Sequence, residues 1–173
     1  MSPILALSGS LRAGSLNTEV LKAAALLAPG RVTLFEGLAD LPAFNPDLDV
    51  DGLPVPPAVA RLRDALRRAK GVLVCCPEYA HGVPGAFKNA LDWVVGSGEL
   101  VDKPVGLVNA SPRSTYVQAQ LTEILTVMNT RLLAGASPAL PQLRRDAVAE
   151  ELVAREDVAG PLRTALAALF GAP

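Results

Sequence analysis

The residues best suited to chemistry lie in one loop, residues 9–18, which combines two glycines with hydroxyl, amide and guanidinium side chains. These groups bind phosphate oxygens well. A short apolar run at residues 3–7 precedes the loop and is typical of a buried strand, and apolar residues at helical spacing follow from Leu16. Free backbone N–H groups and the positive end of a helix dipole meet at such a junction. The loop is therefore predicted to bind a phosphate.

The loop glycines narrow the choice of phosphate ligand. A dinucleotide-binding fingerprint needs a second glycine two residues after Gly9, and none is present there. Gly9 and Gly14 have the spacing of a nucleoside triphosphate loop, but Ser15 and Leu16 occupy its lysine and Ser/Thr positions. Hydroxyls, amides and Arg12 remain, and they suit a terminal phosphate such as that of flavin mononucleotide (FMN). The alternative is that the loop only caps the helix, with its arginine in solvent.

Composition indicates a compact, enzyme-sized protein. Half of the 173 residues are hydrophobic and 19% are charged, which excludes a disordered chain. We expect a single flavodoxin-like FMN-binding domain over residues 1–173. The net charge of −1 argues against nucleic acid and membrane surfaces as partners. Adjacent Cys75 and Cys76 cannot form an ordinary disulfide, and residues 1–8 lack the charged start of a signal peptide. The expected location is cytoplasmic.

Strand and helix patterns alternate along the whole chain. This alternation predicts an α/β fold with helices on both faces of a parallel sheet. With the phosphate loop after the first strand, the expected architecture is a flavodoxin-like three-layer sandwich with five strands in the order 2-1-3-4-5. Arginines on the helix at residues 55–66 are expected in solvent, and Gly160-Pro161 is expected to start the last helix. Strands are predicted at residues 3–7, 32–35, 71–76, 104–109 and 131–133, and helices around residues 16–27, 55–66, 87–94, 117–128 and 162–169.

The loop after the third strand is the second candidate site. In this fold FMN lies where the strand order reverses, between the first and third strands. Residues 77–85 read PEYAHGVPG, and their two prolines and two glycines fix an exposed backbone path that can present amides to a flat ring. Cys75 and Cys76, just before it, are expected in the core on opposite faces of the sheet. His81 is either a wall of the substrate pocket or an exposed loop residue.

Taken together, the motifs resemble the NADPH-dependent FMN reductase family, which includes bacterial quinone, azo-dye and chromate reductases. They are GSLR at residues 9–12, Ser15 and Asn17, PEY at residues 77–79, and VPGAFKNALDW at residues 83–93. The likeness covers about residues 2–130 in order. Two departures stand out: Ala80 replaces the usual asparagine after PEY, and residues 111–116 replace a glycine-rich stretch. These departures bear on flavin and nicotinamide binding.

The resemblance implies FMN as the cofactor and NADPH or NADH as the co-substrate. Arg113 and His81 are tentative members of the substrate pocket, Arg113 as a partner for the NADPH 2′-phosphate. No pattern of ligands indicates a metal. The cofactor-binding residues implied by the resemblance are Ser10, Arg12, Ser15, Leu16 and Asn17 at the phosphate, Pro77, Glu78 and Tyr79 along the isoalloxazine ring, and Ser111 after the fourth strand.

The implied activity is an NAD(P)H-dependent oxidoreductase. A hydride would pass from NAD(P)H through flavin N5 to a small acceptor: a quinone, an azo compound, free flavin or a metal oxyanion. The flavin carries the chemistry, so no catalytic side chain is assigned. The family also implies a homodimer or homotetramer, with Phe87 and Trp93 at the interface, although the simplest interpretation of Trp93 is that it buries apolar area in the core. Two alternatives stay open: a flavodoxin-type electron carrier without its own substrate, and a flavin-free binding domain on the same fold.

Overall fold

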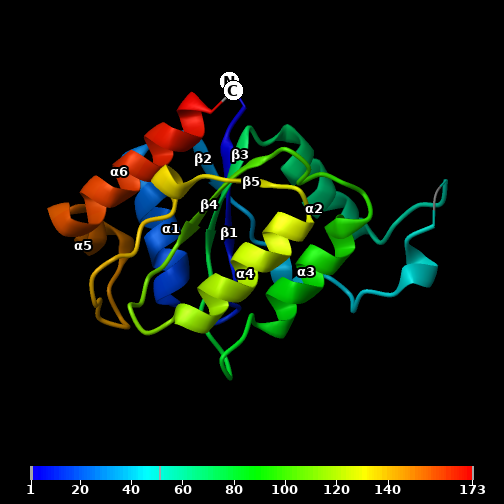
Figure 1. Cartoon of the computed structure of the whole chain (residues 1–173), viewed down its shortest axis with the longest axis horizontal. Coiled ribbons are helices and arrows are strands. Elements are labelled where there is room, and N and C mark those ends of the chain that lie inside the picture. The colour runs from blue at the N-terminus through cyan, green and yellow to red at the C-terminus, as the bar shows by residue number, and fades with distance from the viewer. Residues whose placement is uncertain (1, 51, 173) are drawn as a thin grey trace.

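A parallel sheet with the strand order β2-β1-β3-β4-β5 forms the centre of the fold (Figure 1). The structure, a computed structural model, describes residues 2–50 and 52–172. Every pair of neighbouring strands is parallel. The predicted fold class and strand order are therefore confirmed. The strands are β1 (Ile4–Ser8), β2 (Val32–Leu34), β3 (Gly71–Cys75), β4 (Pro104–Val108) and β5 (Arg131–Leu132).

Helices cover both faces of the sheet. One buried cluster joins α1, α5 and α6 to the sheet, and a second joins α2, α3 and α4 to the opposite face. Figure 1 shows the two groups on either side of the strands. Across the described ranges, no helix has both the length and the apolar character needed to span a bilayer. The helices are α1 (Leu16–Leu27), α2 (Pro57–Arg68), α3 (Gly85–Val95), α4 (Thr115–Val127), α5 (Ala149–Val153) and α6 (Glu156–Gly171).

Alternation along the strands divides the core between the two layers. In β1, Ile4 packs in the cluster under α1 and α6, whereas Leu5 packs in the cluster under α2, α3 and α4. Cys75 and Cys76 follow the same rule, and both are buried. The prediction that they are core residues on opposite faces is confirmed, because successive side chains of a strand point to opposite sides.

The last helix starts earlier than predicted. α6 begins at Glu156, so Pro161 lies inside it and not at its start. A proline within a helix costs about 3 kcal/mol through its lost N–H and its steric clash. Val158 and Leu162, on either side, are fully buried in the cluster under α1 and α6. Burying each such side chain contributes about 1.5–3 kcal/mol, which offsets the cost of the proline.

The segment between β2 and α2 is an arm with short 3-10 turns at Leu38–Asp40 and Pro46–Leu48. Figure 1 shows part of it projecting from the body of the molecule, in cyan. Nη2 of Arg63 lies 2.8 and 2.7 Å from the two carboxylate oxygens of Asp49 and also donates to the Trp93 carbonyl. The prediction that the α2 arginines lie in solvent is wrong for Arg63, since these acceptors compensate its burial.

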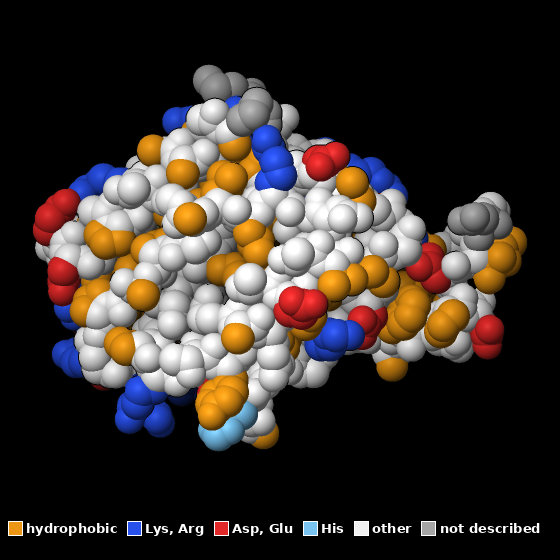
Figure 2. Space-filling view, in the orientation of Figure 1, with side chains coloured by type: hydrophobic (Ala, Val, Ile, Leu, Met, Phe, Trp, Pro, Cys, Tyr) orange, Lys and Arg blue, Asp and Glu red, His pale blue; other side chains and the backbone are white. Residues whose placement is uncertain are grey.

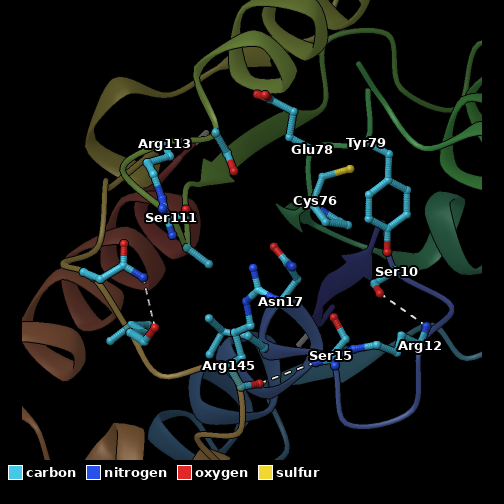
Figure 3. Close-up of a pocket in the computed structure, with 16 residues that line it drawn as sticks. Ser10, Arg12, Ser15, Asn17, Cys76, Glu78, Tyr79, Ser111, Arg113 and Arg145 are labelled. Carbon is cyan, nitrogen blue, oxygen red and sulfur yellow. Dashed lines mark hydrogen bonds between the residues drawn. The ribbon is translucent and has the colours of Figure 1, made fainter. Parts of the chain in front are cut away.

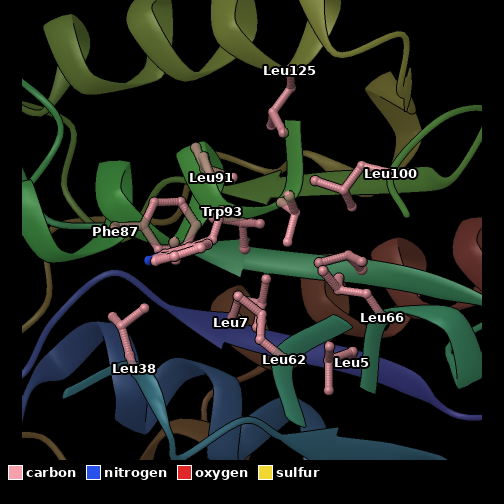
Figure 4. Packing of buried hydrophobic residues seen from close by; sticks show 14 of the residues in the cluster. Leu5, Leu7, Leu38, Leu62, Leu66, Phe87, Leu91, Trp93, Leu100 and Leu125 are labelled. Carbon is pink, nitrogen blue, oxygen red and sulfur yellow. The ribbon is translucent and has the colours of Figure 1, made fainter. Parts of the chain in front are cut away.

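The apolar residues of α3 belong to the core of this chain (Figure 4). Phe87 and Trp93 have at most 1% of their surface exposed. The Phe44 ring packs edge-on against Trp93, with centroids 5.0 Å apart, and Trp93 Nε1 donates to the Pro42 carbonyl at 2.8 Å. The expectation that Phe87 and Trp93 lie at a subunit interface is therefore wrong: the arm and the sheet already cover them.

Candidate functional site

A cavity of about 360 Å³ lies at the edge of the sheet where β1, β3 and β4 end (Figure 3). This is the carboxyl edge of a parallel sheet, where open α/β folds bind their ligands. Its volume falls within the usual range for small-molecule sites. The lining residues are Ser10, Arg12, Ser15, Leu16, Asn17, Cys76, Pro77, Glu78, Tyr79, Ala110, Ser111, Arg113, Ser114, Gln142, Leu143 and Arg145.

The start of α1 presents uncapped donors to the cavity. Ser15 is the N-cap residue, with extended backbone angles, but its side chain makes no capping hydrogen bond. It is nevertheless 97% buried, with 3% of its surface exposed, and it lines the cavity. The first backbone N–H groups of a helix have no partner within the helix, and the helix dipole adds positive potential there. This end of the cavity is therefore suited to an anion.

Arg12 is fixed in position by backbone carbonyls. Its Nη2 donates to the Gly14 carbonyl at 2.9 Å and to the Arg145 carbonyl at 3.4 Å. Its backbone N–H donates to the Ser10 hydroxyl at 3.3 Å. A guanidinium has five N–H donors, so these contacts leave several for a ligand. Arg12 thus both shapes the loop and adds a permanent positive charge beside it.

A buried thiol orients the amide of Asn17. Cys75 Sγ donates to Asn17 Oδ1 at 3.3 Å. Burial, with a smaller contribution from neighbouring Cys76, raises the pKa of the Cys75 thiol, so the thiol keeps its proton and remains a donor. Because the amide oxygen takes this hydrogen bond, the Asn17 amide nitrogen stays available to donate to an acceptor in the cavity.

Glycine is required at position 9, where the loop after β1 meets the end of β3. The Gly9 N–H donates to the Cys75 carbonyl at 2.9 Å. A Cβ at Gly9 would lie 2.2 Å from Cys76 Sγ and 3.1 Å from its Cα, which is too close for any side chain. Cys76, which lines the cavity from the opposite loop, has its pKa raised to about 12 by burial. It is therefore a packing thiol and not a nucleophile at neutral pH.

The carboxylate of Glu78 holds the loop after β3 against the start of α4. Its Oε2 accepts the backbone N–H groups of Tyr116 and Val117, at 2.9 and 3.1 Å. These groups belong to the first turn of α4, whose N-cap, Ser114, makes no side-chain capping bond. Glu78 therefore caps α4 from a distant loop and places a negative charge at the positive end of its dipole.

A tight hairpin follows Glu78. Tyr79 and Gly82 exchange two backbone hydrogen bonds, at 3.1 and 2.9 Å. The two residues between them, Ala80 and His81, both have positive φ angles, of 50° and 57°. Such a turn favours asparagine and glycine. Gln120 of α4 clasps the hairpin by donating to the His81 carbonyl at 3.0 Å and accepting from the Val83 N–H at 3.2 Å.

His81 lies outside the set of residues that line the cavity. It is exposed and stacks on Tyr116, with ring centroids 4.2 Å apart and planes 15° from parallel. The single histidine of the chain, pale blue in Figure 2, projects at the edge of the molecule beside an apolar patch. Of the two readings of His81, the exposed loop residue describes its position better than a wall of the pocket does.

The structure brings the other predicted site residues together: every predicted cofactor-binding residue lines this cavity, and so does Arg113. Lining residues that the sequence did not predict lie in three places. Cys76 was interpreted only as a core residue at the end of a strand, and neither Ala110 nor Ser114, after the fourth strand, was singled out. Gln142, Leu143 and Arg145 lie in a stretch without helix or strand periodicity. The Asn109 backbone holds this stretch through hydrogen bonds with Pro138 and Leu140, at 2.9 and 2.8 Å.

Residues 2–143 match the family described as NADPH-dependent FMN reductase. The chain belongs to this family. The match covers most of the chain and includes both loops that form the cavity. The sequence motifs cover only about residues 2–130. The family match extends further, to Gln142 and Leu143, which line the cavity after β5.

Relatives of the FMN reductase family include enzymes with different acceptors in their names. The chain is 38% identical over 111 residues to an NAD(P)H-dependent FMN reductase of Pseudomonas aeruginosa, covering 62% of this chain and 59% of that protein. It is 36% identical over 105 residues to the quinone reductase of Escherichia coli K12, covering 59% and 53%. The chain thus spans between half and three fifths of the length of these relatives.

Solved structures support the fold over nearly the whole chain. A flavoenzyme NAD(P)H:(acceptor) oxidoreductase from Paracoccus denitrificans superposes with a TM-score of 0.80 at 28% identity, over 98% of both chains. An azoreductase from Bacillus anthracis, at 14% identity, has a TM-score of 0.61 over 98% of this chain and 100% of its own. At that low identity the second similarity concerns the fold alone.

Proposed function

We propose that this protein is an FMN-dependent NAD(P)H oxidoreductase that passes electrons to a small acceptor: a quinone, an azo compound, free flavin or a metal oxyanion. The observation that carries the proposal is the cavity itself. It combines a set of donors suited to phosphate around the start of α1 with the loop at residues 77–79. Membership of the FMN reductase family and the Paracoccus flavoenzyme structure support the same conclusion.

The donor set at the start of α1 fits the phosphate of FMN. Ser10 and Ser15 supply hydroxyls, Asn17 an amide nitrogen and Arg12 a guanidinium, all lining one cavity. Ser15 is almost fully buried, yet its hydroxyl makes no capping bond. Because Ser15 also lines the cavity, its hydroxyl is placed to donate a hydrogen bond to a ligand there. A phosphate ester supplies acceptor oxygens for all of these donors.

The remaining residues of the cavity would hold and orient the ring. Pro77 and Tyr79 line the cavity where the ring would lie, while Glu78, bonded to the start of α4, keeps this loop in place. Arg113, on the far side of the cavity, is suited to an anionic group of the donor, such as the 2′-phosphate of NADPH. FMN bound here would supply the redox chemistry, and these residues would position it.

We also propose that the protein assembles as a homodimer or homotetramer and acts in the cytoplasm. The resemblance to the FMN reductases supports assembly, and apolar side chains at the exposed ends of α3 and α4 are compatible with it. Val95 is 52% exposed and Val127 67% exposed. Both cysteines are free and buried, which suits a reducing compartment. Sedimentation equilibrium would measure the assembly state.

A visible spectrum tests the proposed function. The purified protein is incubated with FMN, freed of excess by gel filtration, and mixed with NADPH without oxygen. Retained yellow flavin that bleaches on addition of NADPH is the expected result. Retained flavin that NADPH and NADH both fail to bleach would contradict the reductase and favour an electron carrier. A protein that retains no flavin and shows no affinity for it in a titration would contradict the flavoprotein assignment.

A further inference from the structure

The cavity carries more positive charge than one phosphate-binding arginine explains. Three guanidinium groups line it, those of Arg12, Arg113 and Arg145, against the single carboxylate of Glu78. That carboxylate already accepts two backbone N–H groups of α4. Three guanidinium groups around one cavity favour an anionic ligand that can interact with more than one of them.

Arg145 lies at the same end of the cavity as the β1–α1 loop. Its backbone carbonyl accepts from Arg12 Nη2 at 3.4 Å, across 133 positions of sequence. Figure 3 shows Arg145 beside Ser15 and Asn17, with Arg113 across the cavity near Ser111. The contact with Arg12 therefore attaches the segment that follows β5 to the phosphate loop and brings a second arginine to it.

Neighbouring arginines in this segment differ in their surroundings. The Arg144 guanidinium pairs with Asp146 at 3.3 Å and with Glu151 at 3.1 Å, and Arg144 does not line the cavity. The Arg145 guanidinium lines the cavity, and among the described residues no carboxylate pairs with it. The Arg145 guanidinium, which is exposed, is therefore available to bind a negatively charged ligand in the cavity.

We propose that Arg145 is a second phosphate-binding residue, which together with Arg12 of the loop binds the FMN phosphate. The proposal rests on the function proposed above. A phosphate monoester carries between about one and a half and two negative charges at neutral pH, more than one arginine neutralises. Arg145 lies outside residues 2–143, the part of the chain that matches the family, so the family motifs do not include it.

Paired titrations with FMN and riboflavin test this role, since the two ligands differ only in the phosphate. Flavin fluorescence would be measured for the unmodified protein and for the Arg145→Ala, Arg145→Lys and Arg144→Ala variants. We expect Arg145→Ala to weaken FMN binding about tenfold, equivalent to about 1.4 kcal/mol, with riboflavin binding unchanged. Arg145→Lys should recover part of the loss, and Arg144→Ala should match the unmodified protein.

Three results would overturn the proposal. FMN affinity unchanged in Arg145→Ala would show that the arginine does not contact the phosphate. An equal loss for FMN and riboflavin, with a lowered melting temperature, would show a structural role only. An unchanged FMN affinity combined with a raised KM for NADPH would assign Arg145 to the electron donor. An unmodified protein that binds neither flavin would instead refute the proposed function, on which this role depends.

Discussion

The two ends of the cavity use their polar groups in opposite ways. At the loop end, residues 9–17, the hydroxyl of Ser15 and the amide nitrogen of Asn17 line the cavity without bonds that would occupy them. At the hairpin end, residues 78–82, the Glu78 carboxylate and the hairpin backbone are bonded to α4. The loop end therefore offers donors to polar ligand atoms, whereas the polar groups of the hairpin end maintain the shape of the cavity.

The largest effect is expected from Gly9→Ala, which would push the two ends apart. The new methyl group would overlap Cys76 Sγ and approach the Cys76 backbone, so the loop after β1 and the loop after β3 would have to separate. We expect a loss of about 3 kcal/mol in the free energy of unfolding, at the upper end of the usual range for overpacking. Urea denaturation would measure it.

Gly85→Ala is the matched control for this substitution. No atom lies within 4 Å of a Cβ built at Gly85, and the residue begins α3 with ordinary backbone angles. It should change the free energy of unfolding by less than about 1 kcal/mol. A Gly9→Ala protein as stable as this control would show that the close contact between the loops is unimportant.

Arg12→Ala tests the loop end alone. Removing a charge-assisted contact should weaken FMN binding by about 2 kcal/mol, roughly thirtyfold, and leave riboflavin binding unchanged. Calorimetric titration with both flavins would measure the two affinities. Because Arg12 also bonds the Gly14 carbonyl, Arg12→Lys serves as a control that keeps the charge. A loss of the same size for riboflavin would contradict a phosphate-specific role.

Glu78→Ala tests the hairpin end. The variant leaves the Tyr116 and Val117 N–H groups without their acceptor, and we expect a loss of about 1–2 kcal/mol in stability, as for other helix caps. Glu78→Gln keeps an acceptor oxygen and should lose less. Hydrogen exchange at the first turn of α4 would localise the effect. If instead flavin affinity fell while α4 kept its protection, the carboxylate would belong to the ligand site.

The smallest effect is expected from Ala80→Gly, and it should be stabilising. Ala80 has a φ of 50°, a conformation that glycine adopts without steric cost. We expect a gain of about 1 kcal/mol in the free energy of unfolding. Ala80→Val, which adds a branched side chain at the same φ angle, should be destabilising. Thermal denaturation of the unmodified protein and of both variants would measure these differences. Equal stability of the three proteins would contradict strain at this turn.

Much of the fold follows from local patterns in the sequence. β1, β3 and β4 are apolar runs in the interior of the sheet. Because strands buried on both faces are nearly continuous apolar runs, these three strands can be predicted from the sequence alone. The start of α6 is harder to predict, because Pro161 is a local stop signal that the burial of Val158 and Leu162 overrides. Burial of this kind depends on tertiary contacts that no local pattern reveals.

The candidate site also has a part that the sequence predicts and a part that it does not. The loop at residues 9–17 is contiguous, so its residue types alone indicate an anion site. Arg145 comes to the cavity through long-range contacts instead: the Asn109 backbone pairs with the chain around Leu140, and Glu19 accepts from the Ala149 N–H at 3.1 Å. Such contacts fix an irregular segment without leaving a periodic signal in it.

A crystal structure of the protein with FMN would show directly whether the two ends of the cavity have these roles. We expect the phosphate at the start of α1, within hydrogen-bonding distance of the Ser15 hydroxyl, the Asn17 amide and the Arg12 guanidinium. We also expect that Glu78 still accepts from the first turn of α4 and touches the flavin only through its backbone. A phosphate bound elsewhere, or a Glu78 carboxylate turned from α4 to the ring, would contradict the division of roles between the two ends.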